Sequence, residues 1–178
     1  ATAGARSVVI GVAPSGGALK AEWILALGQA LRAGLSIVSG LHRKLSEESA
    51  LVAAAAASGQ QLIDLRVPPA SIPIASGRQR SGKRLLMVGT DCCVGKKYSA
   101  LALHRALKAR GVAATFRATG QTGILIAGGG IPMDAVVSDF LSGAAELLTP
   151  DAAPDHWDVI EGQGSLFHPA YAAVTLGL

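Results

Sequence analysis

The chain has 178 residues and a formal net charge of +4, and half of its residues are hydrophobic although only 4% are aromatic. Its basic cluster has no aromatic residues between the charges, which argues against a nucleic-acid-binding protein, and the lack of an apolar run of about 20 residues argues against a membrane span. The two cysteines are adjacent, with Cα atoms only about 3.8 Å apart, which disfavours a disulfide and favours a reducing cytoplasm.

Strands and helices alternate along the first part of the chain. The predicted elements are a strand over 7–13 with a glycine turn at 14–17, a helix over 20–33, a strand over 35–39, a helix over 46–57 with Ser46 as its N-cap, and a strand over 61–67. Such alternation is typical of parallel strands joined by right-handed crossovers, and the aliphatic composition suits a sheet covered by helices. We therefore predict an α/β protein that begins with a Rossmann-like unit over residues 1–77.

A shift in composition separates this unit from a second one. Residues 68–77 are rich in Pro, Ala and Ser, and they lead into the basic cluster Arg78–Arg84, which we expect to be a solvated linker. The elements predicted next are a strand over 84–88, a glycine loop, a helix over 96–109, a strand over 112–116, a polar loop over 118–123, a helix over 132–148 and a strand over 157–160. Residues 78–178 are thus predicted to form a P-loop domain with a parallel sheet. The apolar end over 172–178 has no closing element, so we expect a fragment of a longer protein.

The glycine loop reads GTDCCVGKK over residues 89–97 and lies between a buried strand and a helix. The backbone N–H groups of such a loop converge on an anion, the helix N-terminus adds positive potential, and Lys96 would neutralise a phosphate. The loop therefore predicts a phosphate-bearing cofactor. The candidate cofactor-binding residues are Gly89, Thr90, Asp91, Cys92, Cys93, Gly95, Lys96, Lys97 and Tyr98.

The second lysine of the loop, Lys97, helps to decide which phosphate compound binds there. Most such loops have a Ser or Thr at the place of Lys97, and that hydroxyl helps to bind magnesium. A phosphate loop without this metal ligand suits the pyrophosphate or the 3′-phosphate of coenzyme A, with Lys96 and Lys97 as point charges. ATP bound with Mg²⁺ through Asp91, Glu161 and water is the alternative.

Further candidate residues follow the strands or lie on the last predicted helix. Glu161 follows the strand over 157–160, at the edge where open α/β sheets bind ligands, and we expect it to act as a base or as a metal ligand. Asp134 and Asp139, on the predicted helix after Pro132, are two more candidate catalytic residues. The candidate substrate-binding residues are Thr119, Gly120, Gln121, Thr122, Gly162, Gln163 and His42.

Several strings of this sequence resemble known P-loop proteins. GTDCCVGKK, with EGQG downstream, resembles dethiobiotin synthetase, a SIMIBI-like P-loop enzyme whose loop reads GTDxxVGKT. A closer resemblance, over residues 8–178, is to a bacterial P-loop family of formerly unknown function that includes D-glutamate N-acetyltransferases. This closer resemblance rests on VIGVAPSGG, AGLSIVSGLHRKL, VGTDCCVGKKYSALAL, RATGQTGILIAGGGIPMDAVVSDFLSGAAE and IEGQGSLFHPAY.

The closer resemblance implies an acyltransferase. Acetyl-CoA would donate its acetyl group to the amino group of D-glutamate or a similar amino acid, the loop would hold the coenzyme A phosphates, Glu161 or an Asp would accept the amine proton, and residues 119–122 would orient the substrate. The more distant resemblance implies an ATP- and magnesium-dependent ligase or phosphotransferase, and a nucleotide-binding regulatory protein is a third alternative. We expect a small-molecule partner, a cytoplasmic location and a homo-oligomer, with no nucleic-acid or membrane partner.

Overall fold

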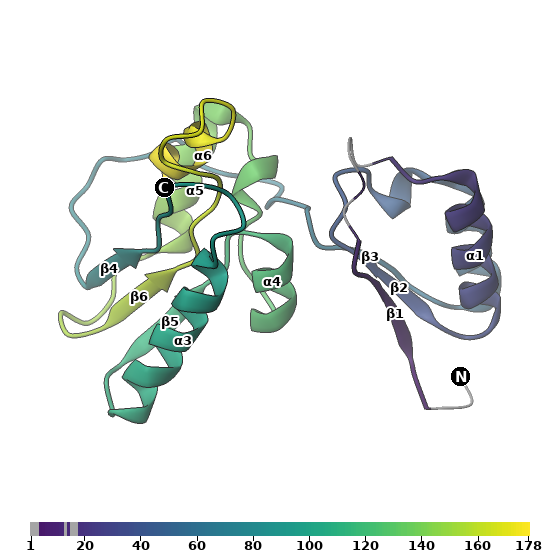
Figure 1. Ribbon diagram of the computed structural model, residues 1–178, viewed down its shortest axis with the longest axis horizontal. Helices are drawn as coiled ribbons and strands as arrows, with labels where there is room; N and C mark the ends of the chain where they lie inside the picture. The colour runs from purple at the N-terminus through teal and green to yellow at the C-terminus, as the bar shows by residue number, and fades with distance from the viewer. Residues whose placement is uncertain (1–3, 13, 15–17) are drawn as a thin grey trace. The chain divides into compact units, whose positions relative to one another are not determined.

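The computed structural model describes residues 4–12, 14 and 18–178, and the chain divides into two compact units, Ala1–Val67 and Pro68–Leu178 (Figure 1). The glycine turn predicted at 14–17 falls largely outside the described residues. Within the described ranges, no helix combines the length and the apolar character that a membrane crossing requires.

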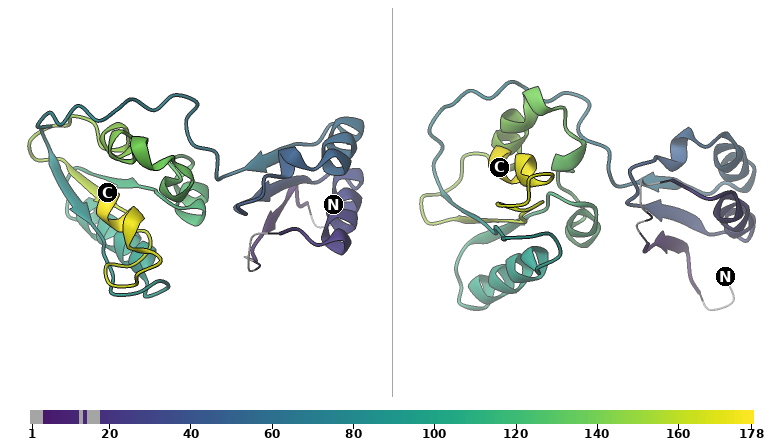
Figure 2. Two further views of the ribbon diagram at one scale, coloured as in Figure 1. Left: turned by 90° about the horizontal axis from the view of Figure 1, so that it is seen from above. Right: turned by 45° about the horizontal axis from the view of Figure 1, so that its top comes forward.

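The first unit is a three-stranded parallel sheet with two helices on one face (Figure 2). The strands pair in the order of their numbers and are β1 (Ser7–Ile10), β2 (Ser36–Ser39) and β3 (Leu62–Asp64). The helices are α1 (Ala21–Arg32) and α2 (Ser49–Ser58). Leu31, Ile37 and Leu51 are fully buried in the core that the helices and the sheet share. The predicted alternation of parallel strands and helices is confirmed.

The predicted N-cap of the second helix is wrong. Ser46 lies in the 3₁₀ turn η2 (Leu45–Glu47), and α2 begins three residues later. The Ser46 hydroxyl donates a hydrogen bond of 2.9 Å to the Asp64 carboxylate, which also accepts the Leu45 N–H at 2.8 Å. The polar side chain therefore ties its turn to the end of β3 instead of capping the helix, a long-range contact that local sequence does not reveal.

The second unit is also built on a parallel sheet, with strands in the order β4-β6-β5. The strands are β4 (Lys83–Leu86), β5 (Ala114–Arg117) and β6 (Trp157–Ile160), and the helices are α3 (Lys96–Ala109), α4 (Gln121–Ala127), α5 (Leu141–Leu148) and α6 (Ala172–Gly177). Figure 2 shows α3 on one face of the sheet and α5 with α6 on the other. Because the strands are parallel, the loops that follow them meet at one edge, and this edge carries the site.

The helix predicted over 132–148 is broken in the structure. Two 3₁₀ turns, η3 (Met133–Ala135) and η4 (Ser138–Phe140), precede α5. Val136 and Val137 lie between the turns with extended backbone, ψ 136° and 133°. Two consecutive β-branched residues have low helix propensity, which favours this interruption. The structure also differs at two other places: Gln121 and Thr122 begin α4 rather than lying in a loop, and the chain end forms α6.

The boundary between the units falls after Val67 rather than at residue 77. The Ser76 and Gly77 N–H groups each donate a hydrogen bond of 2.9 Å to the Glu146 carboxylate of α5. Ile72 packs against the core that α5 forms with β6. These contacts attach the proline-rich stretch to the second unit, whereas its composition alone is typical of a free linker.

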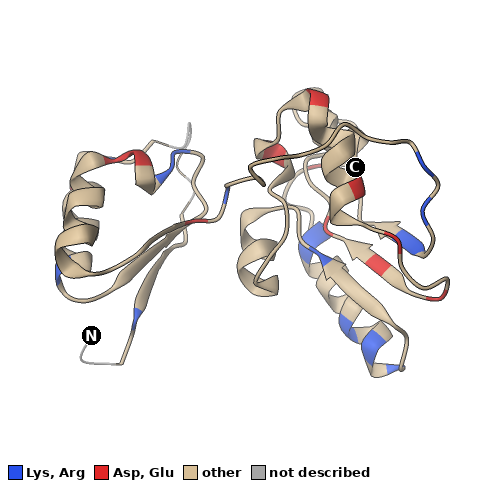
Figure 3. Cartoon of the chain, turned by 180° about the vertical axis from the view of Figure 1, so that it is seen from behind, with Lys and Arg blue, Asp and Glu red and all other residues tan. Residues whose placement is uncertain are grey.

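The basic cluster is only partly a solvated linker: Arg78 and Lys83 are exposed, but Arg80 and Arg84 are half-buried. Figure 3 shows basic residues along the extended segment that leads into β4 and at the start of that strand. The Arg80 guanidinium donates to the Thr149 carbonyl and hydroxyl, at 2.5 and 2.6 Å. Arg84 donates to the carbonyls of Thr149 and Pro150, at 3.2 and 3.0 Å. Carbonyls at a helix C-terminus lack intrahelical partners, so the two arginines satisfy the end of α5.

Substitution of Gly143 tests how closely the segment 68–77 packs on α5. A Cβ atom at this buried position would collide with the Pro73 carbonyl. We expect Gly143→Ala to lower the free energy of unfolding by about 1–3 kcal/mol, even though Ala is the better helix former by about 1 kcal/mol. Urea unfolding measures the change. Ser142→Ala, on the exposed side of the same turn, is the control and should leave stability equal or slightly higher.

Candidate active site

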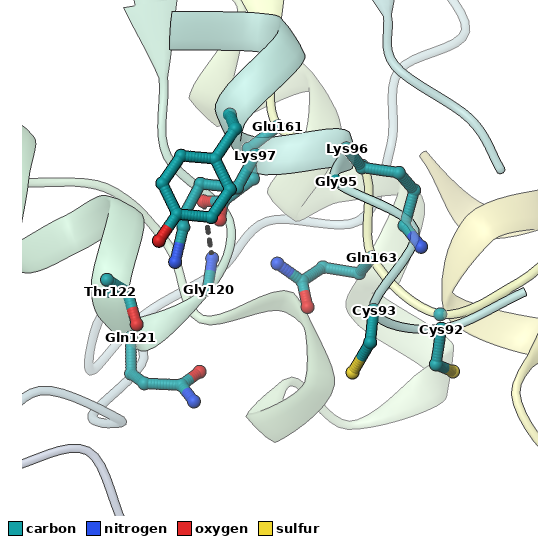
Figure 4. Close-up of a pocket in the computed structure, with 13 residues that line it drawn as sticks. Cys92, Cys93, Gly95, Lys96, Lys97, Gly120, Gln121, Thr122, Glu161 and Gln163 are labelled. Carbon is teal, nitrogen blue, oxygen red and sulfur yellow. Dashed lines mark hydrogen bonds between the residues drawn. The ribbon is translucent and has the colours of Figure 1, made fainter. Parts of the chain in front are cut away.

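A cavity of about 440 Å³ opens at the carboxyl edge of the second sheet (Figure 4). Three segments that are far apart in the sequence enclose it: the glycine loop with the start of α3, the start of α4, and the residues after β6. The lining residues are Cys92, Cys93, Gly95, Lys96, Lys97, Tyr98, Gly120, Gln121, Thr122, Glu161, Gly162, Gln163 and Gly164. Its volume lies within the range of about 300–1,000 Å³ that is usual for small-molecule sites.

The glycine loop has the backbone shape of an anion-binding loop. Gly95 has φ 100° and leads directly into α3, and Cys93, with φ 59°, is the non-glycine residue that takes a positive φ in the described part of the chain. The Lys96 ammonium donates a hydrogen bond of 2.9 Å to the Asp91 carbonyl. This bond folds the lysine back over the loop, where its charge adds to the positive end of the helix.

The first residues of the glycine loop support its shape from the side away from the cavity. Gly89, Thr90 and Asp91 do not line the cavity. The Gly89 and Thr90 carbonyls accept hydrogen bonds from the Leu166 N–H and the Ser165 hydroxyl, at 2.9 and 2.8 Å. The Asp91 carboxylate accepts the N–H of the next residue, Cys92, at 2.6 Å. Gly89 and Thr90 therefore hold the loop against the segment after β6, whereas Asp91 makes its bonds within the loop and to Lys96.

Glu161 is a buried carboxylate at the base of the cavity, 3% exposed. Its Oε2 accepts the N–H group of Thr119 at 2.9 Å and that of Gly120 at 3.0 Å. Figure 4 shows the bond to Gly120. Burial raises the pKa of the Glu161 carboxyl, and the two N–H bonds and the nearby Lys97 ammonium offset this in part. A carboxylate with a raised pKa is a stronger base than an exposed one, which suits proton transfer.

A network of short contacts fixes Glu161 from the side of α4. The Thr119 hydroxyl donates to the Glu161 carbonyl at 2.6 Å and accepts the Gln163 side-chain amide at 3.1 Å. Gly123 is buried against the Glu161 carboxylate, and a Cβ atom there would collide with it. Gly162 likewise has no room for a side chain, because a Cβ atom would meet the Met87 carbonyl. These contacts hold the carboxylate in one position.

Asp134 and Asp139 are not among the residues that line this cavity, and His42 belongs to the first unit. Asp134 is a half-buried residue of η3, and Asp139 is an exposed residue of η4, so neither stands on the long helix that made them candidates. His42 is an exposed residue of the first unit, where burial and the Arg66 charge lower its pKa. Thr119 is buried behind Glu161 and orients it without lining the cavity. Among the described residues, no group of three or more His, Cys, Asp and Glu side chains has a metal-binding arrangement.

Gly123 and Gly164 also contribute to the site, and Gly123 was not among the predicted residues. Gly164 lines the cavity with φ 61°, and a side chain there would collide with the Tyr171 carbonyl. The available signal was the density of glycines in TGQTG and EGQG, which favours close backbone approach. That signal does not say which glycine faces the carboxylate.

Two α/β units, each with a parallel sheet, and a glycine loop between the first strand and the first helix of the second unit define a P-loop protein with a Rossmann-like domain. The chain belongs to the DUF1611 family. A family model described as a P-loop domain of unknown function (DUF1611_C) matches residues 73–178, and one described as a Rossmann-like domain of unknown function (DUF1611_N) matches residues 1–68.

Named relatives and a solved structure resemble the chain over nearly its whole length. It is 57% identical over 176 residues to a protein from Tritonibacter scottomollicae named D-glutamate N-acetyltransferase, and 51% identical over 175 residues to one of the same name from a Pseudoalteromonas species. These alignments cover 99% and 98% of the chain but 53% of each relative, so the chain spans about half the length of the curated relatives it matches.

The crystal structure of a DUF1611 family protein from Anabaena variabilis matches with a TM-score of 0.88 and 42% sequence identity. The match covers 97% of this chain and 50% of that one. The fold described above is therefore also found in a crystal structure of the same family.

Proposed function

We propose that the protein is an acetyl-CoA-dependent N-acetyltransferase that acts on the amino group of D-glutamate or a similar amino acid. The observation that carries this proposal is the 57% identity, over 99% of the chain, to a protein named D-glutamate N-acetyltransferase. The site supports it, because a loop for phosphates and a buried carboxylate line the same cavity. A phosphate-bearing acyl donor and an amine that must lose a proton need these two features.

The glycine loop suits the phosphates of coenzyme A. Lys96 and Lys97 bring two positive charges to one wall of the cavity, and the backbone N–H groups at the start of α3 add donors. Lys97 stands where a magnesium-binding hydroxyl is usual, and an ammonium group neutralises phosphate charge directly. Acetyl transfer from a thioester breaks no phosphate bond, so a loop that only binds phosphate is sufficient for it.

Glu161 is placed to serve the acceptor amine. In the proposed step the amine nitrogen forms a bond to the acetyl carbonyl carbon, the carbon–sulfur bond breaks, and coenzyme A leaves as a thiolate, which takes up the proton that Glu161 has removed from the amine. Glu161 accepts the proton that the amine loses, and its raised pKa makes it a better acceptor. Gln121, Thr122 and Gln163 offer side-chain donors around the same space and would hold the carboxylates of an acidic amino acid.

An assay of thiol release from acetyl-CoA by the full-length protein, with D-glutamate and other amino acids as acceptors, tests the proposal. We expect release that depends on a D-amino acid and is unchanged by EDTA. Mg²⁺-dependent ATP turnover without any thiol release would instead favour a ligase or phosphotransferase. Tight nucleotide binding without either reaction would favour a regulatory protein.

A further inference from the structure

We propose that Tyr98 is the stacking surface for the nucleobase of the ligand whose phosphates occupy the glycine loop, so that the cavity recognises an adenine nucleotide group rather than phosphate alone. This inference rests on the proposed function and adds a binding determinant to the same site. Tyr98 lies in the first turn of α3, directly after the two lysines, and lines the cavity with them.

Tyr98 is unusually exposed for an aromatic residue. It is 72% exposed to solvent, although tyrosine rings usually pack against apolar neighbours and leave only the hydroxyl in water. The Lys97 ammonium lies 5.0 Å from its ring centroid, a distance typical of a cation–π contact. The ring is therefore held beside a cation at the cavity and keeps most of its surface available to a ligand.

The residues around the ring indicate which part of a ligand it would contact. Besides Tyr98, the cavity is lined by the two lysines, the polar start of α4 and the residues after β6 with the Glu161 carboxylate, so it offers charge and hydrogen-bonding groups. An aromatic ring adds one further kind of contact, with the flat face of another ring. Coenzyme A and ATP both carry adenine close to phosphates, whereas the pantetheine arm of coenzyme A has no aromatic group. The nucleotide part is thus the part that Tyr98 contacts.

Calorimetric titration of the full-length protein with the two halves of coenzyme A tests the assignment. For Tyr98→Ala, the Kd of coenzyme A and of 3′-phosphoadenosine 5′-diphosphate should rise about 5- to 150-fold, which corresponds to a base–aromatic stack of about 1–3 kcal/mol. The Kd of 4′-phosphopantetheine, which keeps a phosphate but lacks adenine, should stay within about twofold. Tyr98→Phe, which preserves the ring, is the matched control and should bind all three like the wild type.

A fluorescent ring at the same position gives an independent readout. Tyr98→Trp should show quenched emission when 3′-phosphoadenosine 5′-diphosphate is added and unchanged emission with 4′-phosphopantetheine. The wild type supplies the background. Its two tryptophans are Trp23, in the first unit, and Trp157, which begins β6 at the end of the sheet opposite the cavity.

Each outcome has a distinct meaning. Equal affinity of Tyr98→Ala and the wild type for the adenine compounds would overturn the inference while leaving the acetyltransferase proposal intact. Equal weakening of all three probes would also overturn it, because the ring would then support the loop rather than a base. ATP binding with the same Tyr98 dependence, but no coenzyme A binding, would support stacking and contradict the proposed function. A wild type that binds no adenine compound would overturn both.

Discussion

Replacement of Glu161 by Gln is expected to lower kcat for acetyl transfer by about 10²- to 10⁴-fold, the usual contribution of a positioned general base. Gln has the same shape, and its carbonyl oxygen accepts the Thr119 and Gly120 N–H groups in place of Oε2. The structure of the site should therefore remain, while the ability to take the amine proton is lost. Steady-state kinetics with acetyl-CoA and D-glutamate measure the change.

Glu146→Gln is the matched control for this variant. Glu146 also accepts two backbone N–H groups, from Ser76 and Gly77, but it lies outside the cavity. The Glu146→Gln enzyme should keep its activity, because the Glu146 carboxylate only binds the segment before β4. A Glu161→Gln enzyme within about threefold of wild-type kcat would contradict the role of Glu161 as the base.

The pH dependence follows from the same carboxyl group. Burial raises the pKa of Glu161, so kcat/KM should rise with pH through a pKa above the ordinary carboxyl range of about 4.3. The sign for stability is opposite. A carboxyl with a raised folded-state pKa stabilises the fold below its unfolded pKa, and this contribution is lost as pH rises through the folded pKa. Glu161→Gln should remove this contribution to the pH dependence of kcat/KM and to that of stability. A wild-type kcat/KM that does not change with pH above pH 4 would contradict the raised pKa of Glu161.

Replacement of Lys96 by Met is expected to raise the Kd of acetyl-CoA about 30- to 4,000-fold, corresponding to about 2–5 kcal/mol for the loss of one partner of a desolvated charge pair. Met keeps an unbranched stem of similar length, so the contacts of the lysine stem with the loop are largely preserved. The loss then reports the ammonium group, through its charge toward the phosphates and its hydrogen bond to the Asp91 carbonyl. Calorimetric titration measures it.

Lys108→Met serves as the control for Lys96→Met. Lys108 lies in the last turn of the same helix and is exposed, far along α3 from the glycine loop. Its removal lowers the net charge of the protein equally but should leave the Kd nearly unchanged. If both variants weaken acetyl-CoA binding alike, the effect is one of overall charge and Lys96 has no specific contact with phosphate.

Local signals predicted much of the fold correctly. The observed bounds of α3, Lys96–Ala109, and of β6, Trp157–Ile160, are those that the sequence indicates. Both have strong signals, a glycine loop before the helix and a β-branched, apolar run in the strand. The errors arose where long-range contacts decide the structure. Ser46 bonds to Asp64 rather than capping α2, and Glu146 binds the segment that resembled a linker.

Residues of the cavity, too, were predicted where local signals decide the structure and missed where long-range contacts do. The residues of GKKY, GQT and EGQ that line the cavity were all candidates, because parallel strands bring the loops that follow them to one edge. Asp134 and Asp139 were predicted to lie on one helix, and the two valines between them interrupt it. The contact of Gly123 with Glu161 joins α4 to β6 across the fold, and no local pattern encodes such a contact.

Isothermal calorimetry of the full-length protein with acetyl-CoA in EDTA, and separately with ATP in the presence and absence of Mg²⁺, tests the central claim most directly. The claim predicts metal-independent binding of acetyl-CoA that Lys96→Met weakens, without tight Mg²⁺-dependent ATP binding. Tight binding of Mg²⁺-ATP, with no heat from acetyl-CoA, would contradict the assignment of the glycine loop to coenzyme A and with it the proposed acetyltransferase.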